Sequence, residues 1–322
     1  FQNSYDPAQL ILPYYDGETT ETAKVPASQI YNLVISDLTD AIELLDGYVR
    51  TDKSKIDKTI AQGLLAYVHA GMGNFADAKV MADAVIASGY PLTTAGALAY
   101  PGAGSGFNDV NSPSWIWAFD LTEELGHQLI DWWGQMDPFT YSYAWAGDHK
   151  SIDDALYAQI DASDVRKTQF GTGTAPLQAI NKFFDPNRTI GGQYIITTDL
   201  IFMRVEEFYL LSAESAARTG NEAAAKATMI EMLDNRMPNA ASTVNALSGT
   251  ALQDFIYLQT KIELWGEGKT YFAMKRNQAT VSRGTNHVYR ANESFVHDSD
   301  EMSFQIPESE INNNPSISEQ NN

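Results

Sequence analysis

The stretch LLAYVHAGMGNFADAK at residues 64–79 decides the fold, because it returns 147 positions later, at residues 211–226, as LSAESAARTGNEAAAK. Counting the proline that follows each copy, nine positions are identical: Leu64, Ala66, Ala70, Gly73, Asn74, Ala76, Ala78, Lys79 and Pro91 match Leu211, Ala213, Ala217, Gly220, Asn221, Ala223, Ala225, Lys226 and Pro238. Each copy predicts a helix, a Gly-Asn turn, a second helix and a terminating proline. Alanines let two helices approach closely, glycine permits a left-handed cap, and asparagine caps the next helix.

This spacing is typical of tetratricopeptide repeats, in which helical hairpins stack side by side. Two unrelated alanine-rich hairpins are the alternative, but the shared Gly-Asn and Pro positions favour a true repeat. Two units are fewer than a stack needs, so further helices must complete it. Apolar periodicity predicts one helix over residues 25–45 and another over residues 252–276, with a bend or break at Gly266 and Gly268.

Residues 92–199 have a different composition and predict a long irregular insertion between residues 1–91 and residues 200–322, the latter holding the second repeat, the bent helix and a tail. The fold class is therefore mostly α, a tetratricopeptide-like stack with an insertion that contains short β-strands. Trp115, Trp117 and Phe119 alternate as in the core of a short strand. Long insertions on rigid scaffolds often carry function.

The insertion concentrates aromatic residues, with nine between Trp115 and Trp145, including five of the six tryptophans. Those after position 131 lie among glycines, a proline and aspartates without a helical period, so some rings should face solvent. Flat rings beside carboxylates and amides suit a sugar, whose C–H faces stack on rings. We therefore expect a ligand-binding surface, although packing of the insertion onto the helices is the alternative. The candidate residues are Trp132, Trp133, Tyr141, Tyr143 and Trp145.

Catalytic, metal and cofactor signals are weak. The five histidines lack metal-ligand spacing, no serine lies in a nucleophile motif, and the glycines of residues 102–106 lack nucleotide-binding spacing. Adjacent acids such as Glu206 and Glu207 could serve glycoside hydrolysis, but pairs are expected by number among 41 acidic residues. We expect no enzyme activity, no metal and no cofactor.

Net charge and the lack of cysteine exclude several kinds of binding partner and several cysteine-based features. A net charge of −20 argues against binding nucleic acid or anionic lipid through a basic face. No apolar run is long enough to span a bilayer, and the absence of cysteine excludes disulfides, thiolate metal sites and lipidation within these residues. The chain begins at Phe1, which predicts either a processed product or a fragment.

Several segments in order along the chain resemble the SusD/RagB-like outer-membrane nutrient-binding proteins. They are residues 30–41 with Asp37-Leu38, the Gly73-Asn74-Phe75 turn, Asp164-Val165-Arg166, residues 202–216 with Arg204, Glu207 and Glu214, residues 263–276 with Gly266 and Gly268, and Ile306-Pro307 with Asn314-Pro315. The resemblance implies a helical tetratricopeptide stack, structural ion pairs at Arg204 and Glu207, and a bend at the two glycines.

The resemblance also implies a function. It suggests a non-catalytic surface lipoprotein of the outer membrane that captures oligosaccharides and passes them to a TonB-dependent, SusC-like transporter. Its lipid anchor and further helices would precede Phe1. Ligand contacts do not transfer by motif, so the aromatic candidates rest on this sequence alone. Two alternatives stay open: a tetratricopeptide scaffold that binds a protein or peptide, and a glycosidase.

Overall fold

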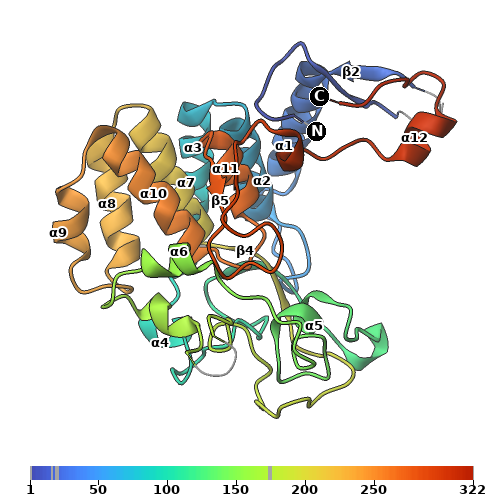
Figure 1. The fold of residues 1–322 in the computed structure, drawn as a ribbon. Helices are drawn as coiled ribbons and strands as arrows, with labels where there is room; N and C mark the ends of the chain where they lie inside the picture. Colours follow the sequence, from blue (N-terminus) through green and yellow to red (C-terminus); the bar gives the residue numbers. More distant parts are fainter. Residues whose placement is uncertain (1, 16, 19–21, 173–175, 322) are drawn as a thin grey trace.

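The computed structural model describes residues 2–15, 17–18, 22–172 and 176–321. It is mostly helical with short antiparallel strand pairs, which confirms the predicted fold class (Figure 1). The helices are α1 (Ala27–Leu44), α2 (Lys58–Gly71), α3 (Phe75–Ile86), α4 (Ala95–Leu98), α5 (Trp132–Met136), α6 (Asp154–Ala158), α7 (Glu206–Arg218), α8 (Glu222–Leu233), α9 (Ala240–Asn245), α10 (Gly249–Glu263), α11 (Thr270–Arg276) and α12 (Glu308–Asn313), with short 3₁₀ turns η1 (Glu123–Leu125), η2 (Val165–Gln169) and η3 (Asp300–Met302). The strands are β1 (Leu10–Pro13), β2 (Lys24–Pro26), β3 (Trp115–Phe119), β4 (Leu200–Arg204), β5 (Val281–Ser282) and β6 (Ser294–Phe295).

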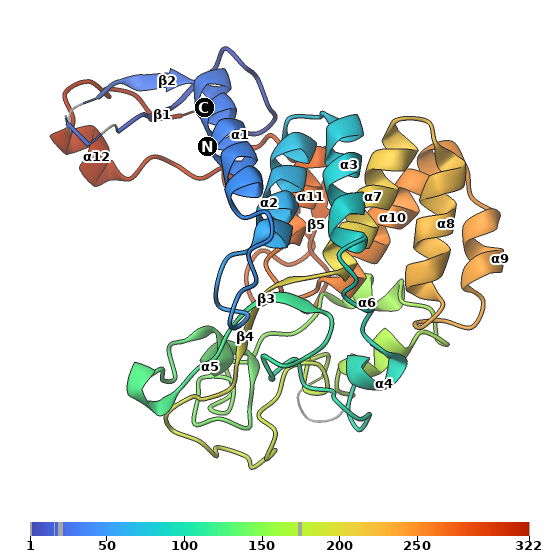
Figure 2. The ribbon, with the colours of Figure 1, turned by 180° about the vertical axis from the view of Figure 1, so that it is seen from behind.

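The helical stack forms one row, in which α2 packs on α3, α3 on α7 and α7 on α8. Figure 2 shows these helices side by side from α1 to α9, although more than a hundred residues separate α3 from α7 in the chain. Two of the alanine pairs shared by the repeats lie at the helix contacts: Ala66, Ala78, Ala213 and Ala225 are all fully buried. Small side chains thus bring the helices of the two hairpins close together.

The Gly-Asn turns of the two hairpins have the same backbone conformation. Gly73 and Gly220 have φ of +81° and +80°, the left-handed region that glycine adopts without strain. The following amide of Asn74 donates to His69 O at 2.9 Å, and that of Asn221 donates to Ala216 O at 2.8 Å. These bonds satisfy carbonyls at the C-terminal ends of α2 and α7.

The predicted asparagine cap is present in only one copy. The side chain of Asn221 accepts from Ala224 N, whereas that of Asn74 makes no capping bond to α3. The backbone angles of the two residues are nearly the same, so the turn itself does not depend on the side-chain bond.

Of the bend or break predicted in the last long helix, the structure shows a complete break. The first part, α10, ends at Glu263, and α11 begins at Thr270. Gly266 and Gly268 between them have φ of +79° and +74°. A Cβ on Gly266 would also lie 2.7 Å from the ring of Phe183, so glycine here lets the insertion approach the turn.

The insertion lies below the stack in Figure 1 and has its own apolar core, built around Trp115, Trp133 and Phe183 and completed by Ile262 of α10. Strand β3 near its beginning pairs antiparallel with β4 directly after its end. The register shifts twice within this pair. For that reason the expected alternation fails: Trp115 is buried, Trp117 is half-buried and Phe119 is exposed.

Both ends of the chain contribute to an arm beside α1, visible at the upper right of Figure 1. Strand β1 pairs with β2, and Asn3 donates to Asp298 O. The apolar side of α1 is only partly covered, since Leu33 and Leu44 are exposed. The periodicity of residues 25–45 therefore predicted the helix correctly but not a fully buried face.

Candidate ligand-binding surface

Three aromatic rings from two segments of the insertion form an exposed cluster, which we call the aromatic surface: Tyr141, Trp145 and Tyr194. The rings of Tyr141 and Trp145 lie 4.9 Å apart at 35°, and those of Tyr141 and Tyr194 lie 5.5 Å apart at 45°. Each side chain retains between 43% and 53% of its accessible area. Rings that contact one another yet stay this exposed offer faces to a ligand.

The segment of residues 140–145 presents its aromatics outward by alternation. Thr140, Ser142 and Ala144 are buried, while Tyr141, Tyr143 and Trp145 between them are exposed. The hydroxyls of Thr140 and Ser142 both donate to Asp137 O, at 3.0 and 2.8 Å. Small side chains on the inner side therefore fix the segment and leave every large ring on the outer side.

A second segment, residues 190–194, is held against the first by its backbone. The amides of Gly191 and Gly192 donate to Pro138 O and Phe139 O, and the amide of Tyr141 donates to Gln193 O at 3.0 Å. At Gly191, a Cβ would lie 2.9 Å from the indole of Trp145. Glycine is thus needed there for the indole of Trp145 to approach this segment so closely.

Two buried aspartates fasten the segments together beneath the rings. The carboxylate of Asp137 accepts from Phe139 N at 2.9 Å and from Asp185 N at 2.8 Å, while Asp185 accepts from the side chain of Gln193 at 2.6 Å. Burial raises the pKa of Asp137 to about 7, although these two backbone amides lower it. The support of the aromatic surface therefore contains a carboxyl group that titrates near neutral pH.

The predicted residues divide into three groups. Tyr141 and Trp145 belong to the aromatic surface, and Tyr143 is exposed beside them but makes no ring contact with them among the described residues. Trp132 is half-buried and packs edge-on against Trp133 and Phe183. The expected exposure does not hold for Trp133, which is fully buried because its indole N–H donates to Asp199 O inside the insertion core.

Tyr194 is the member that sequence reasoning missed. It lies within residues 92–199, for which the sequence predicted an irregular insertion with short strands. Among the described residues the only regular feature of residues 183–198 is an isolated bridge between Gln193 and Thr140. A signal for the outward rings was present, however: large aromatics alternate with small residues from Thr140 to Trp145.

The family-like motifs meet in a buried ion cluster between the stack and the insertion. Glu263 of α10 accepts from Arg166 at 3.0 Å, Arg204 at 2.8 Å and Arg236 at 2.9 Å. Burial alone would raise the pKa of Glu263, but Arg236, Arg204 and Arg166 hold it well below its usual value. The cluster consists of Arg166, Lys182, Arg204, Arg236, Asp164, Glu206, Glu263 and Glu267, all nearly inaccessible to solvent.

Arg204 and Glu207, for which the resemblance implies structural pairs, both form ion pairs. The side chain of Arg204 pairs with Glu206, Glu263 and Glu267, whereas Glu207 accepts from Arg204 only at the backbone amide. Glu207 instead pairs with Lys269 at 3.2 Å and accepts from the hydroxyl of Tyr67. Arg204 and Glu207 are thus both structural, but in separate contacts.

Glu206 and Glu207, the acidic pair considered for hydrolysis, and the adjacent acids Asp153 and Asp154 are used in structural contacts. Glu206 and Glu207 are buried in the contacts above, and Asp153 and Asp154 accept from the amides of Gly284 and Thr285. Within the described ranges, no group of three or more His, Asp and Glu side chains could hold a metal ion. No helix in those ranges is both long and apolar enough to cross a bilayer.

Comparison with protein families decides the identity. The sequence profile of the SusD family matches residues 139–322. The chain belongs to the SusD family. No curated protein sequence matches it.

Solved structures of SusD-family proteins share the fold over nearly the whole chain. A SusD-like carbohydrate binding protein from Bacteroides vulgatus superposes with a TM-score of 0.78 at 23% identity, covering 97% of this chain and 71% of that one. A SusD superfamily protein from the same species gives a TM-score of 0.79 at 20% identity, covering 98% and 70%. One from Bacteroides thetaiotaomicron gives 0.76 at 21% identity, covering 98% and 72%. At these identities the likeness shows the SusD fold alone.

Proposed function

We propose that this SusD-family chain is a non-catalytic binding protein that captures oligosaccharides on the aromatic surface. The observation that carries the proposal is the cluster of Tyr141, Trp145 and Tyr194, whose rings are exposed yet held by two fastened backbone segments. A rigid aromatic surface binds a sugar ring without first ordering itself, which reduces the entropic cost of association. The name of the similar Bacteroides vulgatus protein, a carbohydrate binding protein, points to the same ligand class.

This proposal assigns a different role to each part of the chain. Residues 92–199 carry the ligand surface, and residues 1–91 and 200–322 form the helical scaffold that holds it. The family further suggests where the protein works: at the cell surface, tethered to the outer membrane by a lipid outside these residues, where it passes its ligand to a TonB-dependent, SusC-like transporter.

Isothermal titration calorimetry with neutral hexaoses of glucose, xylose and mannose tests the binding step. We expect at least one to bind, and Trp145→Ala or Tyr194→Ala to weaken it about tenfold or more, the equivalent of about 1.4 kcal/mol. Tyr289→Ala is the control, because Tyr289 is also an exposed aromatic residue but lies in a different loop, between β5 and β6. Binding that survives Trp145→Ala and Tyr194→Ala unchanged would contradict the proposed surface.

Two further outcomes separate the alternatives. A peptide library that binds the chain while every sugar fails would instead favour a tetratricopeptide-type scaffold. Delivery to the transporter is tested by expressing the two proteins together: the transporter should co-purify with the lipid-anchored protein from outer membranes. Its absence from that complex would contradict the partner without affecting the sugar-binding result.

A further inference from the structure

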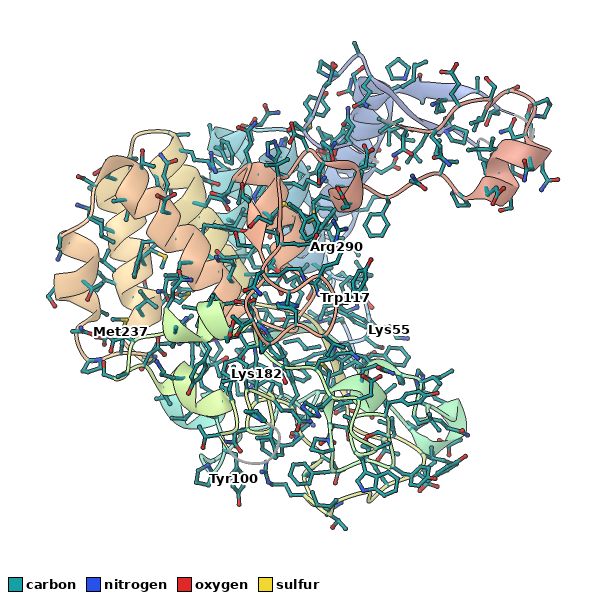
Figure 3. All side chains as sticks on the ribbon, in the orientation of Figure 1. Lys55, Tyr100, Trp117, Lys182, Met237 and Arg290 are labelled. Carbon is teal, nitrogen blue, oxygen red and sulfur yellow. The ribbon has the colours of Figure 1, made fainter. Side chains whose placement is uncertain are left out.

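A second concave site lies outside the aromatic surface, where the α1–α2 loop meets the end of β3. It is an open cleft of about 760 Å³. This lies within the range of roughly 300–1,000 Å³ that is usual for small-molecule sites. In Figure 3, Lys55 of this loop and Trp117 of β3 lie on the same side of the molecule. The lining residues used below are Arg50, Lys53, Tyr90, Asn111, Phe119 and Asp120.

The walls of the cleft are tied together, so the site is pre-formed. The amide of Ala118 in β3 donates to Lys53 O at 3.1 Å, and the Lys53 ammonium donates to Ser112 O at 2.6 Å. On the opposite wall, Arg50 pairs with Asp57 at 3.0 Å and donates to the hydroxyl of Tyr90. These contacts join the loop to β3, to the segment before β3 and to the end of the first hairpin.

The polar groups of the cleft include both donors and acceptors. Because Arg50 donates to the Tyr90 oxygen, that hydroxyl keeps its own proton to donate. Burial raises the pKa of Tyr90, so it stays protonated at neutral pH. The Lys53 ammonium has three N–H donors, more than its bond to Ser112 uses. Asp120 and Asn111 are exposed and supply acceptor oxygens.

The apolar part of the cleft is one aromatic face. Phe119 ends β3 and retains 37% of its accessible area, in contrast to the buried Trp115 of the same strand. The exposed part of this ring is accessible to a ligand in the cleft. An aromatic face with surrounding donors and acceptors is the arrangement that a sugar ring needs.

The charges indicate which kind of sugar. The positive charge of Arg50 is matched by Asp57, and Lys53 is accompanied by the acidic Asp52 and Asp120 in the lining. No excess of positive charge remains in the cleft, and the chain as a whole carries −20. Such a site repels a uronate or a sulfated sugar and accepts a neutral one.

We infer that the cleft between the α1–α2 loop and β3 is a second carbohydrate-binding site, which takes neutral sugar residues with Phe119 as its stacking ring and Lys53, Tyr90, Asn111 and Asp120 as its polar contacts. The inference rests on the proposed function, since the ligand class is the same. It adds a site that the helical scaffold and the insertion build together, whereas the aromatic surface belongs to the insertion alone.

The test uses calorimetry on the full chain with the neutral hexaoses named above and with hexagalacturonate as the acidic probe. Phe119→Ala should weaken the neutral hexaose that binds about tenfold or remove one binding event, the equivalent of about 1.4 kcal/mol. Asp120→Asn, at an exposed position that leaves the fold intact, should weaken it several-fold. Phe202→Ala is the matched control: Phe202 is similarly exposed on the paired strand β4, but lies outside the cleft.

The outcomes distinguish the two proposals. If Trp145→Ala removes binding while Phe119→Ala and Asp120→Asn leave it unchanged, the cleft is not a site and the aromatic surface stands. Tighter binding of hexagalacturonate than of any neutral hexaose, sensitive to Phe119→Ala, overturns the neutral class. If no neutral hexaose binds the wild-type chain, both proposals fail.

Discussion

The helical stack and the insertion are stabilised by different kinds of contact. In the stack, Ala66 and Ala78 of one hairpin and Ala213 and Ala225 of the other are fully buried, and apolar surface meets apolar surface. In the insertion, Asp137, Thr140 and Ser142 are buried too, and each is fixed by a particular hydrogen bond. The stack therefore depends on side-chain size, whereas the insertion adds to its own apolar core the pairing of individual polar atoms.

The difference shows how a fold with little regular structure can still be rigid. A buried polar group is costly unless it has a partner, so each satisfied bond excludes many alternative arrangements of the chain. The insertion uses this specificity where it has no long helices. The buried ion cluster joins the two regions, because Glu263 of the stack is paired with Arg166 of the insertion.

The largest change in the free energy of unfolding should come from the buried ion cluster that joins the two regions. Glu263→Gln leaves Arg166, Arg204 and Arg236 without their shared counter-charge and should lower the free energy of unfolding by about 3–5 kcal/mol, as for other broken buried pairs. Glu293→Gln is the control, because Glu293 pairs with Arg290 at an exposed position and should cost about 0–1 kcal/mol. Denaturant titration measures both. Equal losses in the two variants would show that burial of the cluster has no special effect.

The next largest effect should be the pH dependence of stability that Asp137 of the insertion causes. The folded-state pKa of Asp137 is about 7, above an unfolded value of about 3.9. At pH values between these two, the carboxyl group of Asp137 keeps a proton in the folded protein that it has lost in the unfolded chain. The stability linked to this proton is present at pH 4 and is lost as the pH rises through 7. The loss is up to about 4 kcal/mol.

Unfolding free energies at pH 5 and pH 8 check this expectation by comparing the wild type with Asp137→Asn. The asparagine cannot ionise, so the variant should lose less stability over this interval. Other titrating groups are common to both proteins and cancel in the difference. A wild-type minus variant difference that is the same at both pH values would refute the role of Asp137.

In the stack, stability depends on the volume of the buried side chains. The two repeats supply equivalent positions at which this can be tested. Ala78→Leu and Ala225→Leu should each lower the free energy of unfolding by about 1–3 kcal/mol through overpacking. Ala76→Leu and Ala223→Leu, at exposed positions two residues earlier in each copy, should have little effect. Thermal melts of the four variants test this. Very different losses at Ala78 and Ala225 would show that the two copies no longer pack equivalently.

The smallest effect on stability is expected at the aromatic surface. Trp145→Ala removes a ring that already faces solvent, so the free energy of unfolding should change by less than about 0.5 kcal/mol. The same denaturant titration that measures Glu263→Gln serves for this variant. A loss above about 2 kcal/mol would indicate that the ring acts as packing for the insertion, which would count against its proposed use for a ligand.

The sequence predicted the stack well because its determinants are local. Gly73, Asn74 and the alanines at helical spacing specify both the turn and the contact face, and the copy at Gly220 repeats them. The break after α10 was likewise readable from Gly266 and Gly268. What periodicity could not show was how completely a face is covered, as the partly exposed α1 demonstrates.

The aromatic surface was only half predictable for a physical reason. Tyr141 and Trp145 are close in sequence, and the small residues between them indicate which side is buried. Tyr194 joins them because the neighbouring amides of Gly191 and Gly192 donate to Pro138 O and Phe139 O, and such backbone bonds leave no mark in side-chain composition. Trp133 has a neighbourhood similar to that of Trp132 in the sequence, and only the distant acceptor Asp199 O distinguishes its buried position.

The pairing of β3 with β4 has a consequence for how such molecules can diversify. Residues 120–199 leave the stack from one strand and return on its hydrogen-bonded neighbour, so the two ends of this excursion are held next to each other. A chain segment whose ends meet can be lengthened or shortened in its outer loops at small entropic cost to the framework that it leaves and rejoins. Within residues 120–199, however, Arg166 and Lys182 pair with Glu263 and Glu267 of the scaffold, so they must stay in place when the outer loops vary.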